Sequence, residues 1–527
     1  MFGGHTSTAR DASEVSSTTL KADLTSQVHQ AHQFKTGLEF VYNELQLDYG
    51  TVNLVFPESN NYVKERHTPM RGAFYVQDKI ETKGFIAHLG LRLDYNNPHK
   101  EWIAANPFDK LFYSSRYDPA TDFTSKKAKS ELTFSPRLTI SHPITVSSKL
   151  FFNYGHFKQL PTYEQIFRLS RGAFKQVLNI GNPELAFAKT ISYELGYDHA
   201  LFEKYLLQVA AFYHDITDQQ DMTTFISADG SIQYARANNN SYEDIRGFEL
   251  GLRKSRGRWF NGFANYTFQV TTSGRFGRAQ IWEDPSEQRR YDRRTSNLYQ
   301  VRPRPQPYAR ANVTLSTPND FGPEFLGTPL LGGWSANLLG DWRAGFNSTW
   351  NPNNIASINQ NVKNKDFYNV VLRLTKSFGL GKAKLTFLAD VNNLLNTKRL
   401  SLVGFYDFND FQDYFNSLRL PASRAYNNIA GNDKVGDYRK EGVAYQPIVQ
   451  VGLVSDIQNP NVNAIYYERT SGRYINYLND TWSEVESGRL NKVLKDKAYI
   501  DMPNQASFNF LSPRDVFVGL RMSFDLE

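Results

Sequence analysis

The segment that decides the fold class is the last strand-like stretch of the chain, Asp515 to Phe524, which reads D-V-F-V-G-L-R-M-S-F. Successive side chains of an extended strand point to opposite faces. One face is therefore apolar, with Val516, Val518, Leu520, Met522 and Phe524. The other is largely polar, with Phe517, Gly519, Arg521 and Ser523. Repeated units of about ten residues with this alternation are typical of a transmembrane β-barrel.

The same alternation recurs along most of the chain and predicts about fifteen antiparallel strands. The predicted strands are residues 20–28, 34–45, 72–80, 85–95, 132–140, 149–157, 191–198, 205–215, 245–253, 260–270, 308–315, 334–346, 367–378, 383–394 and 515–524. We place the turn between 132–140 and 149–157 near His142-Pro143. The fold class predicted is all-β, an antiparallel transmembrane barrel.

Composition separates this prediction from other membrane folds. The 527 residues are 40% hydrophobic, with a mean hydropathy of −0.52. No run of about 18 apolar residues occurs, which argues against a transmembrane helix. A barrel needs apolar side chains only at alternate positions, so its overall composition stays polar. The 30 Tyr and 38 Phe fit aromatic girdles at the two membrane interfaces.

Connections between the predicted strands alternate between short and long. The junctions at Glu81, His142, Phe202, Ser255 and Gly379 are short, whereas those at Asn96, Lys158, Gln220, Thr271, Phe346 and Asn396 are long. Short turns on the periplasmic side and long extracellular loops are expected of a bacterial barrel. Residues 1–18, rich in Ser, Thr, Ala and Gly, are predicted to be an N-terminal loop at the edge of a truncation. An odd number of strands cannot close an antiparallel barrel, so either one strand escapes the pattern or the barrel is partial. We assign residues 19–527 as a partial barrel, in which 395–514 is expected to be one long extracellular loop.

Charged residues on the polar faces of the strands are candidates for the lumen wall and for ligand contacts. They are Arg92, Asp94, Glu194, Glu249, Arg253, Asp341, Arg343, Arg373 and Asp390. A hydrated wall of paired charges is the favoured interpretation over a ligand role. The pairs Arg289-Arg290 and Arg293-Arg294 could bind an anion, although a solvated loop is favoured there too. His88 has no second ligand at metal spacing, so a polar lumen residue is favoured over a metal ligand.

Several function classes find no support in the sequence. The chain has no cysteine, which removes disulfides and thiolate chemistry. The net charge of +7 is spread without a long basic run, so nucleic-acid binding is not expected. No nucleophile elbow, H-E-x-x-H or P-loop is present. We therefore expect no enzyme activity, cofactor or resident metal.

Four short motifs in chain order resemble those of TonB-dependent outer-membrane receptors. They are Y-G-H-F running into L-P-T-Y-E-Q at 154–165, N-P-E-L with I-S-Y-E-L-G-Y at 182–197, F-Y-H-D-I-T-D at 212–218, and F-L-A-D-V-N-N-L-L-N at 387–396. Ala186-Phe187-Ala188 stand where the family usually has Lys-Pro-Glu. The resemblance covers residue 20 to the end and is greatest to Bacteroidota-type receptors.

The resemblance implies a 22-strand barrel with a plugged lumen. The plug, the TonB box, a signal peptide and about seven strands would precede this sequence, which is then expected to be a fragment. It implies a receptor in the outer membrane of a Gram-negative bacterium. Such a receptor binds a scarce extracellular ligand, such as an iron chelate, cobalamin, an oligosaccharide or a peptide, and imports it with TonB energy. Outer-membrane lipid, the TonB complex through the missing N-terminal part, and a surface lipoprotein are the expected partners.

Three alternatives stay open at this point. A passive porin-like channel would have 16–18 strands, close to the predicted number. A surface adhesin or binding barrel would use its loops for partner contacts. A soluble all-β carbohydrate-binding protein would also be rich in tyrosine, but it has no reason to place short and long connections on opposite sides.

Overall fold

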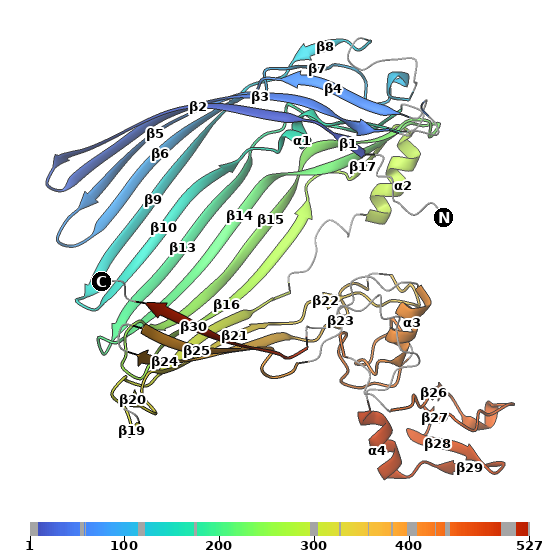
Figure 1. Cartoon of the computed structure of the whole chain (residues 1–527). Helices are drawn as coiled ribbons and strands as arrows, with labels where there is room; N and C mark the ends of the chain where they lie inside the picture. The colour runs from blue at the N-terminus through green and yellow to red at the C-terminus, as the bar shows by residue number, and fades with distance from the viewer. Residues whose placement is uncertain are drawn as a thin grey trace. The chain divides into compact units, whose positions relative to one another are not determined.

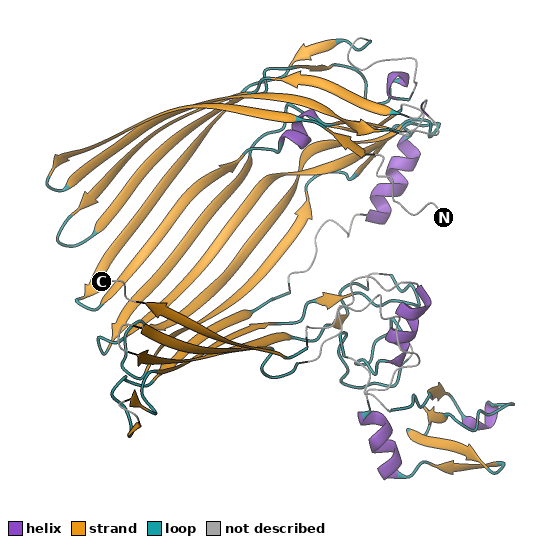
Figure 2. Cartoon of the chain, viewed as in Figure 1, coloured by secondary structure: helices purple, strands orange, loops and turns teal. Residues whose placement is uncertain are grey.

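A computed structural model of the chain describes residues 9–52, 57, 60–113, 122–172, 176–295, 304–325, 328–356, 358–380, 383–397, 408–426, 428–437, 443–496 and 513–524. The chain divides into two compact units. The first contains Met1–Leu250 with Phe268–Pro305, and the second contains Gly251–Thr267 with Gln306–Glu527. Both are built mainly of strands (Figures 1 and 2).

The elements that begin in the first unit are β1 (Ala9–Asp11), β2 (Glu14–His29), β3 (His32–Thr51), β4 (Asn61–His67), β5 (Met70–Glu81), β6 (Ile86–Asn97), β7 (Glu101–Ile103), η2 (Lys110–Phe112), β8 (Ser125–Lys127), β9 (Glu131–Thr145), β10 (Ser148–Gln159), α1 (Tyr163–Phe167), β11 (Leu169–Arg171), β12 (Val177–Ile180), β13 (Ala188–Leu201), β14 (Tyr205–Ile226), β15 (Gln233–Lys254), β17 (Gln280–Trp282) and α2 (Pro285–Thr295). The end of β15 belongs to the second unit.

After the end of β15, the second unit contains the first half of β16 (Phe260–Arg275). It continues with β18 (Tyr308–Ser316), β19 (Glu324–Phe325), β20 (Thr328–Pro329), β21 (Trp334–Arg343), β22 (Asn347–Ser348), β23 (Val362–Lys363), β24 (Phe367–Leu380), β25 (Ala383–Asn392), α3 (Phe408–Ser417), β26 (Ile448–Val451), η3 (Val454–Asp456), β27 (Ile465–Glu468), β28 (Arg473–Leu478), β29 (Thr481–Glu484), α4 (Ser487–Lys495) and β30 (Asp515–Phe524).

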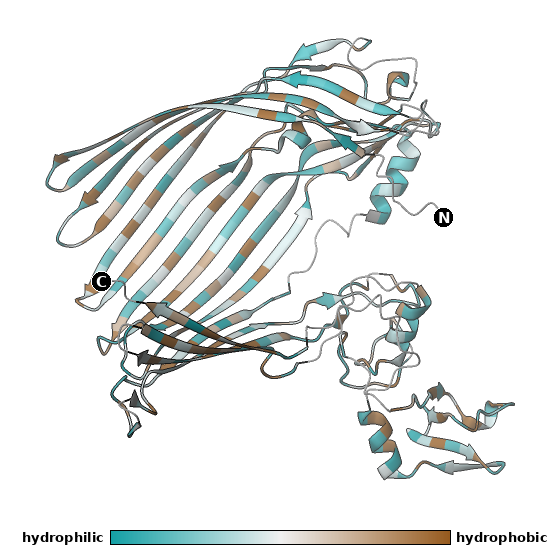
Figure 3. Ribbon diagram, in the orientation of Figure 1, coloured by the Kyte–Doolittle hydropathy of each residue, from teal (hydrophilic) through white to brown (hydrophobic). Residues whose placement is uncertain are grey.

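In the first unit the long strands form one antiparallel ladder in the order β2, β3, β5, β6, β9, β10, β13 and β14. Leu38, Phe74, Leu93 and Phe134 are directly opposite one another on four adjacent strands. Leu38, Phe74 and Phe134 are 55%, 48% and 59% exposed. The apolar face of this ladder is therefore its exposed face, which is the reverse of a soluble sheet. Figure 3 shows the alternating bands along the strands.

The opposite face of this ladder is polar and carries interstrand hydrogen bonds. The Tyr75 hydroxyl on β5 donates to Asp23 Oδ1 on β2, at 2.5 Å, across Gly37 on the intervening β3. A side chain at Gly37 would overlap both partners. Glycine is therefore required at this position so that a tyrosine can reach over one strand to the next.

In the second unit the ladder order is β16, β18, β21, β24, β25 and β30. Its apolar face is also exposed, with Val313 at 38% and Leu520 at 71%. On the other face Asn312 and Asn337 exchange side-chain amide hydrogen bonds at 3.2 and 3.0 Å. The terminal stretch that suggested a barrel is thus the last strand of this ladder, paired with β25 from Ala383↔Phe524 to Asn392↔Asp515.

Fifteen strands of nine or more residues occur in the described ranges, and they match the fifteen predicted segments. They are β2, β3, β5, β6, β9, β10, β13, β14, β15, β16, β18, β21, β24, β25 and β30. Short turns join consecutive strands, as between β13 and β14, where Phe202 and Glu203 both have positive φ (51° and 57°). The backbone N–H of Lys204 donates to the Leu201 carbonyl at 3.1 Å and closes this turn.

One predicted turn is wrong. His142 and Pro143 lie within β9, opposite Leu150 and Lys149 of β10. The turn is at residues 146–147, and the register shifts at Ser148/Lys149. Proline cannot donate a ladder hydrogen bond and usually marks a strand end or a bulge. Here it stands near the bulge, so its position in the sequence misplaced the turn by a few residues.

Several predicted loops contain regular structure. Residues 1–18 include β1 and the start of β2, and 220–244 is largely the ends of β14 and β15. The 271–306 region holds the end of β16, β17 and α2, while 395–514 holds α3, the four-stranded sheet β26–β29 and α4. These elements are short, or they pair with distant segments, as β14 does with β17 and β12 with β15 in parallel. Alternation along the sequence does not reveal such pairings.

Among the described residues, no helix combines the length and the apolar character needed to cross a bilayer.

Gly262 on β16 offers a test of the second ladder. A methyl group at this position would overlap the carbonyl oxygen of Asn312 on β18. We expect Gly262→Ala to lower the free energy of unfolding by about 1–3 kcal/mol, the usual cost of overpacking. The matched control is Gly340→Ala on β21, where the added carbon would lie 3.9 Å from the Ala311 carbonyl oxygen. Urea titration of the two variants in lipid vesicles measures the difference, and equal stability would contradict this packing.

Candidate functional site

The loops of the first unit that lie away from its short turns fold into a cap (Figure 2), and buried side chains form a core within it. The buried side chains of this core come from the loop elements and from the far ends of β14 and β15. They are Phe112, Phe123, Leu169, Val177, Ile180, Phe225, Ile232 and Tyr234. Phe112 and Phe225 each stack on Tyr234, with ring centroids 4.6 and 5.3 Å apart. An aromatic core of this kind holds the loops in a defined arrangement.

Helix α1 anchors one side of the cap to β3. The Thr162 hydroxyl accepts a hydrogen bond from the Gln165 backbone N–H, and Gln165 Oε1 accepts one from the Thr162 backbone N–H, which forms a capping box. Asn43 Nδ2 on β3 donates to the Tyr163 hydroxyl at 2.6 Å. Ile166 and Phe167 pack with Leu45 in a small buried cluster. The L-P-T-Y-E-Q motif thus builds a helix docked on β3.

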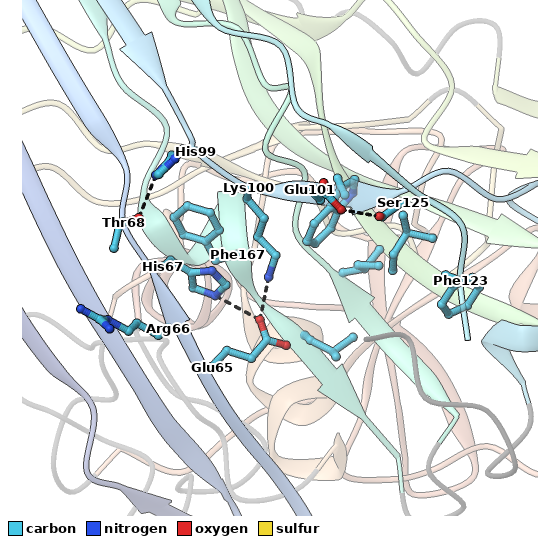
Figure 4. A pocket seen from close by; sticks show the side chains of 14 residues that line it. Glu65, Arg66, His67, Thr68, His99, Lys100, Glu101, Phe123, Ser125 and Phe167 are labelled. Carbon is cyan, nitrogen blue, oxygen red and sulfur yellow. Dashed lines mark hydrogen bonds and ion pairs between the residues drawn. The ribbon is translucent and has the colours of Figure 1, made fainter. Parts of the chain in front are cut away.

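A pocket of 460 Å³ opens beside this helix (Figure 4). Its lining comes from β4, from residues 99–103, from β8 and from α1, among other elements. Its apolar side includes Trp102, Phe123 and Phe167, and its polar side includes Glu65, His67 and Lys100. An apolar lining with a few convergent polar groups is typical of small-molecule sites of this size.

Two titratable side chains, those of Lys100 and His67, converge on the Glu65 carboxylate in this pocket. Glu65 Oε2 lies 2.7 Å from Lys100 Nζ and 3.1 Å from His67 Nε2. The side chains of Glu65 and Lys100 are 25% and 22% exposed, whereas that of His67 is 2% exposed. Arg66, between Glu65 and His67, points to the other face of β4 and pairs with Glu44 at 2.8 Å (Figure 4). Alternation along β4 therefore turns the side chains of Glu65 and His67 to one face of the strand and that of Arg66 to the other.

Aromatic rings fix the orientation of these groups. The His67 ring stacks on Phe167 at 4.2 Å with an interplanar angle of 5°. Lys100 Nζ lies 5.4 Å from the Trp102 centroid and 6.0 Å from that of Phe167, within the range of cation–π attraction. The ammonium group is thus held between a carboxylate and two aromatic rings. These contacts hold the Lys100 and His67 side chains in fixed orientations.

The environment shifts the pKa values of Glu65 and His67. Both residues lie on the long-loop side, outside the part of the strands that faces lipid. Burial alone would raise the pKa of Glu65, but its contact with His67 and the charge of Lys100 outweigh burial and lower that pKa to about 2. Burial, together with the Lys100 charge, lowers the pKa of His67 against the opposing effect of Glu65. At neutral pH the pocket thus contains a carboxylate, an ammonium group and a neutral imidazole.

Acid is expected to loosen the pocket. Both folded-state pKa values lie below their ordinary values, so each group binds protons more readily in the unfolded chain, and stability falls as pH falls. The His67 contribution is lost below about pH 6.5, and that of Glu65 is lost between about pH 4.5 and 2. Amide exchange of β4, corrected for intrinsic rates, should therefore increase between pH 7 and 5. His67→Phe should abolish that pH dependence, whereas His142→Gln should retain it.

The nine predicted charges are distributed along the strands, and none lines this pocket. Arg92 pairs with Asp94 at 2.8 Å, and Arg373 forms two hydrogen bonds of 2.7 Å with Asp390. Asp341 pairs with Arg310, which the sequence did not single out. Glu194 accepts a hydrogen bond from Asn153, and Arg343 lies 5.9 Å from the Phe367 ring centroid. Glu249 and Arg253 lie on β15.

The two arginine pairs that could bind an anion, Arg289-Arg290 and Arg293-Arg294, lie on helix α2 and not in a loop. In α2, Arg290 pairs with Glu287 at 2.8 Å, and Arg289 donates to the Ser286 hydroxyl. Neighbouring Arg278 binds Asp292 through two hydrogen bonds. These contacts give the cations partners within the same cap.

The pocket itself escaped the sequence interpretation because residues 57–69 and 96–129 were both assigned as loops. One signal was available: Tyr62-Val63-Lys64-Glu65-Arg66-His67 favours a short strand by its β-branched and aromatic content. Nothing in the sequence placed Lys100 beside it. In the described ranges no cluster of three or more His, Asp or Glu side chains could hold a metal ion.

Comparison with known proteins adds the family. The model of the TonB dependent receptor-like β-barrel family matches residues 2–394. Solved structures similar to the chain include the FrpB iron transporter from Neisseria meningitidis (12% identity, TM-score 0.48), the outer membrane transporter YddB from Escherichia coli (13%, 0.46) and a ferric enterobactin receptor mutant, PfeA, from Pseudomonas aeruginosa (14%, 0.46). Each alignment covers 73% of this chain and 50–51% of the other. No curated protein matches.

The chain thus spans about half the length of the solved structures that it matches. The family match covers most of its strands, and the exposed apolar faces of both ladders are those that such barrels present to lipid. On this evidence, the chain belongs to the TonB-dependent receptor-like β-barrel family and is an outer-membrane protein of a Gram-negative bacterium.

Proposed function

We propose that the protein to which this chain belongs is an active-transport receptor that binds a scarce extracellular ligand and imports it with TonB energy. The observation that supports this proposal is the ordered cap on the long-loop side, which contains a 460 Å³ pocket. The strands that carry this cap belong to the receptor-like barrel family. A passive channel needs no such pocket. The proposed ligand belongs to one of four classes: an iron chelate, cobalamin, an oligosaccharide or a peptide.

The partners follow from the same proposal. TonB would act through a part of the protein that is N-terminal to these strands, and a surface lipoprotein would assist capture at the cap. The charges of the inner wall, such as Arg92, Asp94, Arg373 and Asp390, would pair with each other or face a plug. Binding and passage leave the ligand unaltered, so we propose no catalytic step.

Uptake by the native protein in its own cell tests the proposal. Four labelled probes represent the ligand classes: cyanocobalamin, ferric citrate, a maltooligosaccharide and a tripeptide. We expect deletion of the gene to lower the uptake of one of these probes by at least tenfold. Deletion of tonB should give the same loss, and the double deletion should give no further loss. Uptake of that probe that persists without TonB would identify a passive channel. Unchanged uptake of all four, with loss of surface adhesion, would identify an adhesin.

The role of the pocket is tested separately, with the probe that the uptake assay selects. Trp102→Ala removes an aromatic wall of the pocket and should weaken binding of that probe to whole cells about tenfold, the loss expected of a buried aromatic contact. The matched control is Tyr113→Ala, an aromatic residue of the same loop that is 54% exposed and does not line the pocket. Equal binding of the probe by both variants would show that the ligand binds outside this pocket.

A further inference from the structure

A groove interrupts the exposed apolar face of the second ladder. Phe260, Leu315, Ala336 and Leu374 lie opposite one another on β16, β18, β21 and β24. Because Ala336 is the one small member of this row, the sheet surface is hollow there. The groove has a volume of 320 Å³ and is lined mainly by apolar side chains.

The groove opens on the lipid-facing side of the wall. Phe260 and Leu315 are 38% and 49% exposed. Asn312 on β18 and Asn337 on β21 point to the opposite, polar face of the sheet, where their side-chain amides are hydrogen-bonded to each other. The hollow is therefore continuous with the surface that contacts the bilayer, and hydrocarbon is the solvent that would fill it.

Two tryptophans border the groove at the short-turn end of the strands, which is the periplasmic end in this family. Trp334 Nε1 donates a hydrogen bond of 3.1 Å to the Leu330 carbonyl. Trp259 packs edge-to-face on Phe321, with centroids 5.0 Å apart. Tryptophan concentrates at the level of lipid headgroups. The two fixed rings thus place the groove just inside the periplasmic headgroup layer.

Cations lie beside the same end. The β15–β16 turn carries Lys254, Arg256 and Arg258 within five residues. Lys254 Nζ lies 3.4 Å from the centroid of the Phe260 ring, which is a wall of the groove. Arg258 pairs with Asp320 at 3.2 Å. The turn carries a net positive charge next to an apolar hollow, a combination that complements an anionic phospholipid.

We propose that this groove binds one phospholipid of the periplasmic leaflet. An acyl chain lies over Ala336 between Leu315 and Leu374, and the phosphate contacts the cations of the 254–258 turn. The tryptophans hold the glycerol region between them. This site does not depend on the transported ligand or on TonB.

Native mass spectrometry of the full chain, refolded in detergent and titrated with palmitoyl-oleoyl phosphatidylglycerol, tests the site. We expect one tightly bound lipid per chain. Ala336→Leu fills the hollow and should weaken that binding at least tenfold. The matched control, Ala22→Leu, adds the same side chain to the exposed apolar face of β2 and should leave it unchanged. Both variants must show the wild-type circular dichroism spectrum.

A second variant tests the headgroup contact without filling the groove. Arg256→Glu reverses a turn charge and should weaken phosphatidylglycerol binding about tenfold, while palmitoyl-oleoyl phosphatidylethanolamine should be affected less. Equal lipid binding by the wild type, Ala336→Leu and Arg256→Glu would overturn the proposal. Chain dimers that dissociate in Ala336→Leu would overturn it as well, because a second copy would then be the occupant.

Discussion

Replacing Leu91 by arginine is expected to lower the free energy of unfolding in lipid vesicles by about 2–4 kcal/mol, the cost of a cation on the lipid face near mid-membrane. Leu91 lies on β6 between Val76 of β5 and Pro136 of β9. It is 44% exposed, and Val76 is 38% exposed. An arginine there would place its charge in hydrocarbon, and its cross-strand neighbours Val76 and Pro136 offer no counter-ion. Urea titration of the refolded chain measures the loss.

Thr139→Arg supplies the control for Leu91→Arg. Thr139 lies on the adjacent strand, opposite His88 and Asn153, on the polar face of the same ladder. The same added charge should cost less than about 1 kcal/mol there, because that face is hydrated. If the two variants lose stability equally, the exposed apolar face does not contact lipid, and the soluble all-β alternative would be favoured.

The second large effect is expected for Glu65→Gln in the pocket. Loss of the carboxylate leaves the Lys100 ammonium, 22% exposed, beside a neutral amide. Breaking a fully buried pair costs 3–5 kcal/mol, so about 2–3 kcal/mol is expected for this partly exposed one. Local opening of β4 and of residues 99–103 should then increase by about 30-fold to 150-fold, because each 1.4 kcal/mol is a factor of ten. Amide hydrogen exchange reports this opening residue by residue.

Two further variants separate charge pairing from general damage to the cap. Glu101→Gln changes a neighbouring carboxylate that accepts a hydrogen bond from Ser125, and it should alter exchange by less than about threefold. Glu65→Gln combined with Lys100→Met removes both charges and should recover most of the lost protection, as paired apolar replacements do. Unchanged exchange in Glu65→Gln would show that the pair contributes no more than a surface ion pair.

The wall could be predicted from the sequence because its physics is local. A strand that separates lipid from a hydrated lumen must alternate, and the alternation at Val516–Phe524 or Phe85–Tyr95 needs no distant partner to be recognised. The ladders β5–β6 and β25–β30 confirm those faces residue by residue. The turn near His142-Pro143 was wrong because one proline within a bulged strand carries the same local signal as a turn.

The pocket was decided by tertiary structure, since its groups come from segments with no shared pattern. Glu65 and His67 are two residues apart on β4, but Lys100 comes from a separate loop and Phe167 from α1. Their meeting depends on β4 pairing with the far end of β3 and on Asn43 binding Tyr163. The sequence by itself determined which face of each strand meets lipid, because that choice is made one residue at a time. Only the packing of the loops decided which charges share a site, because non-local contacts are set by the whole chain.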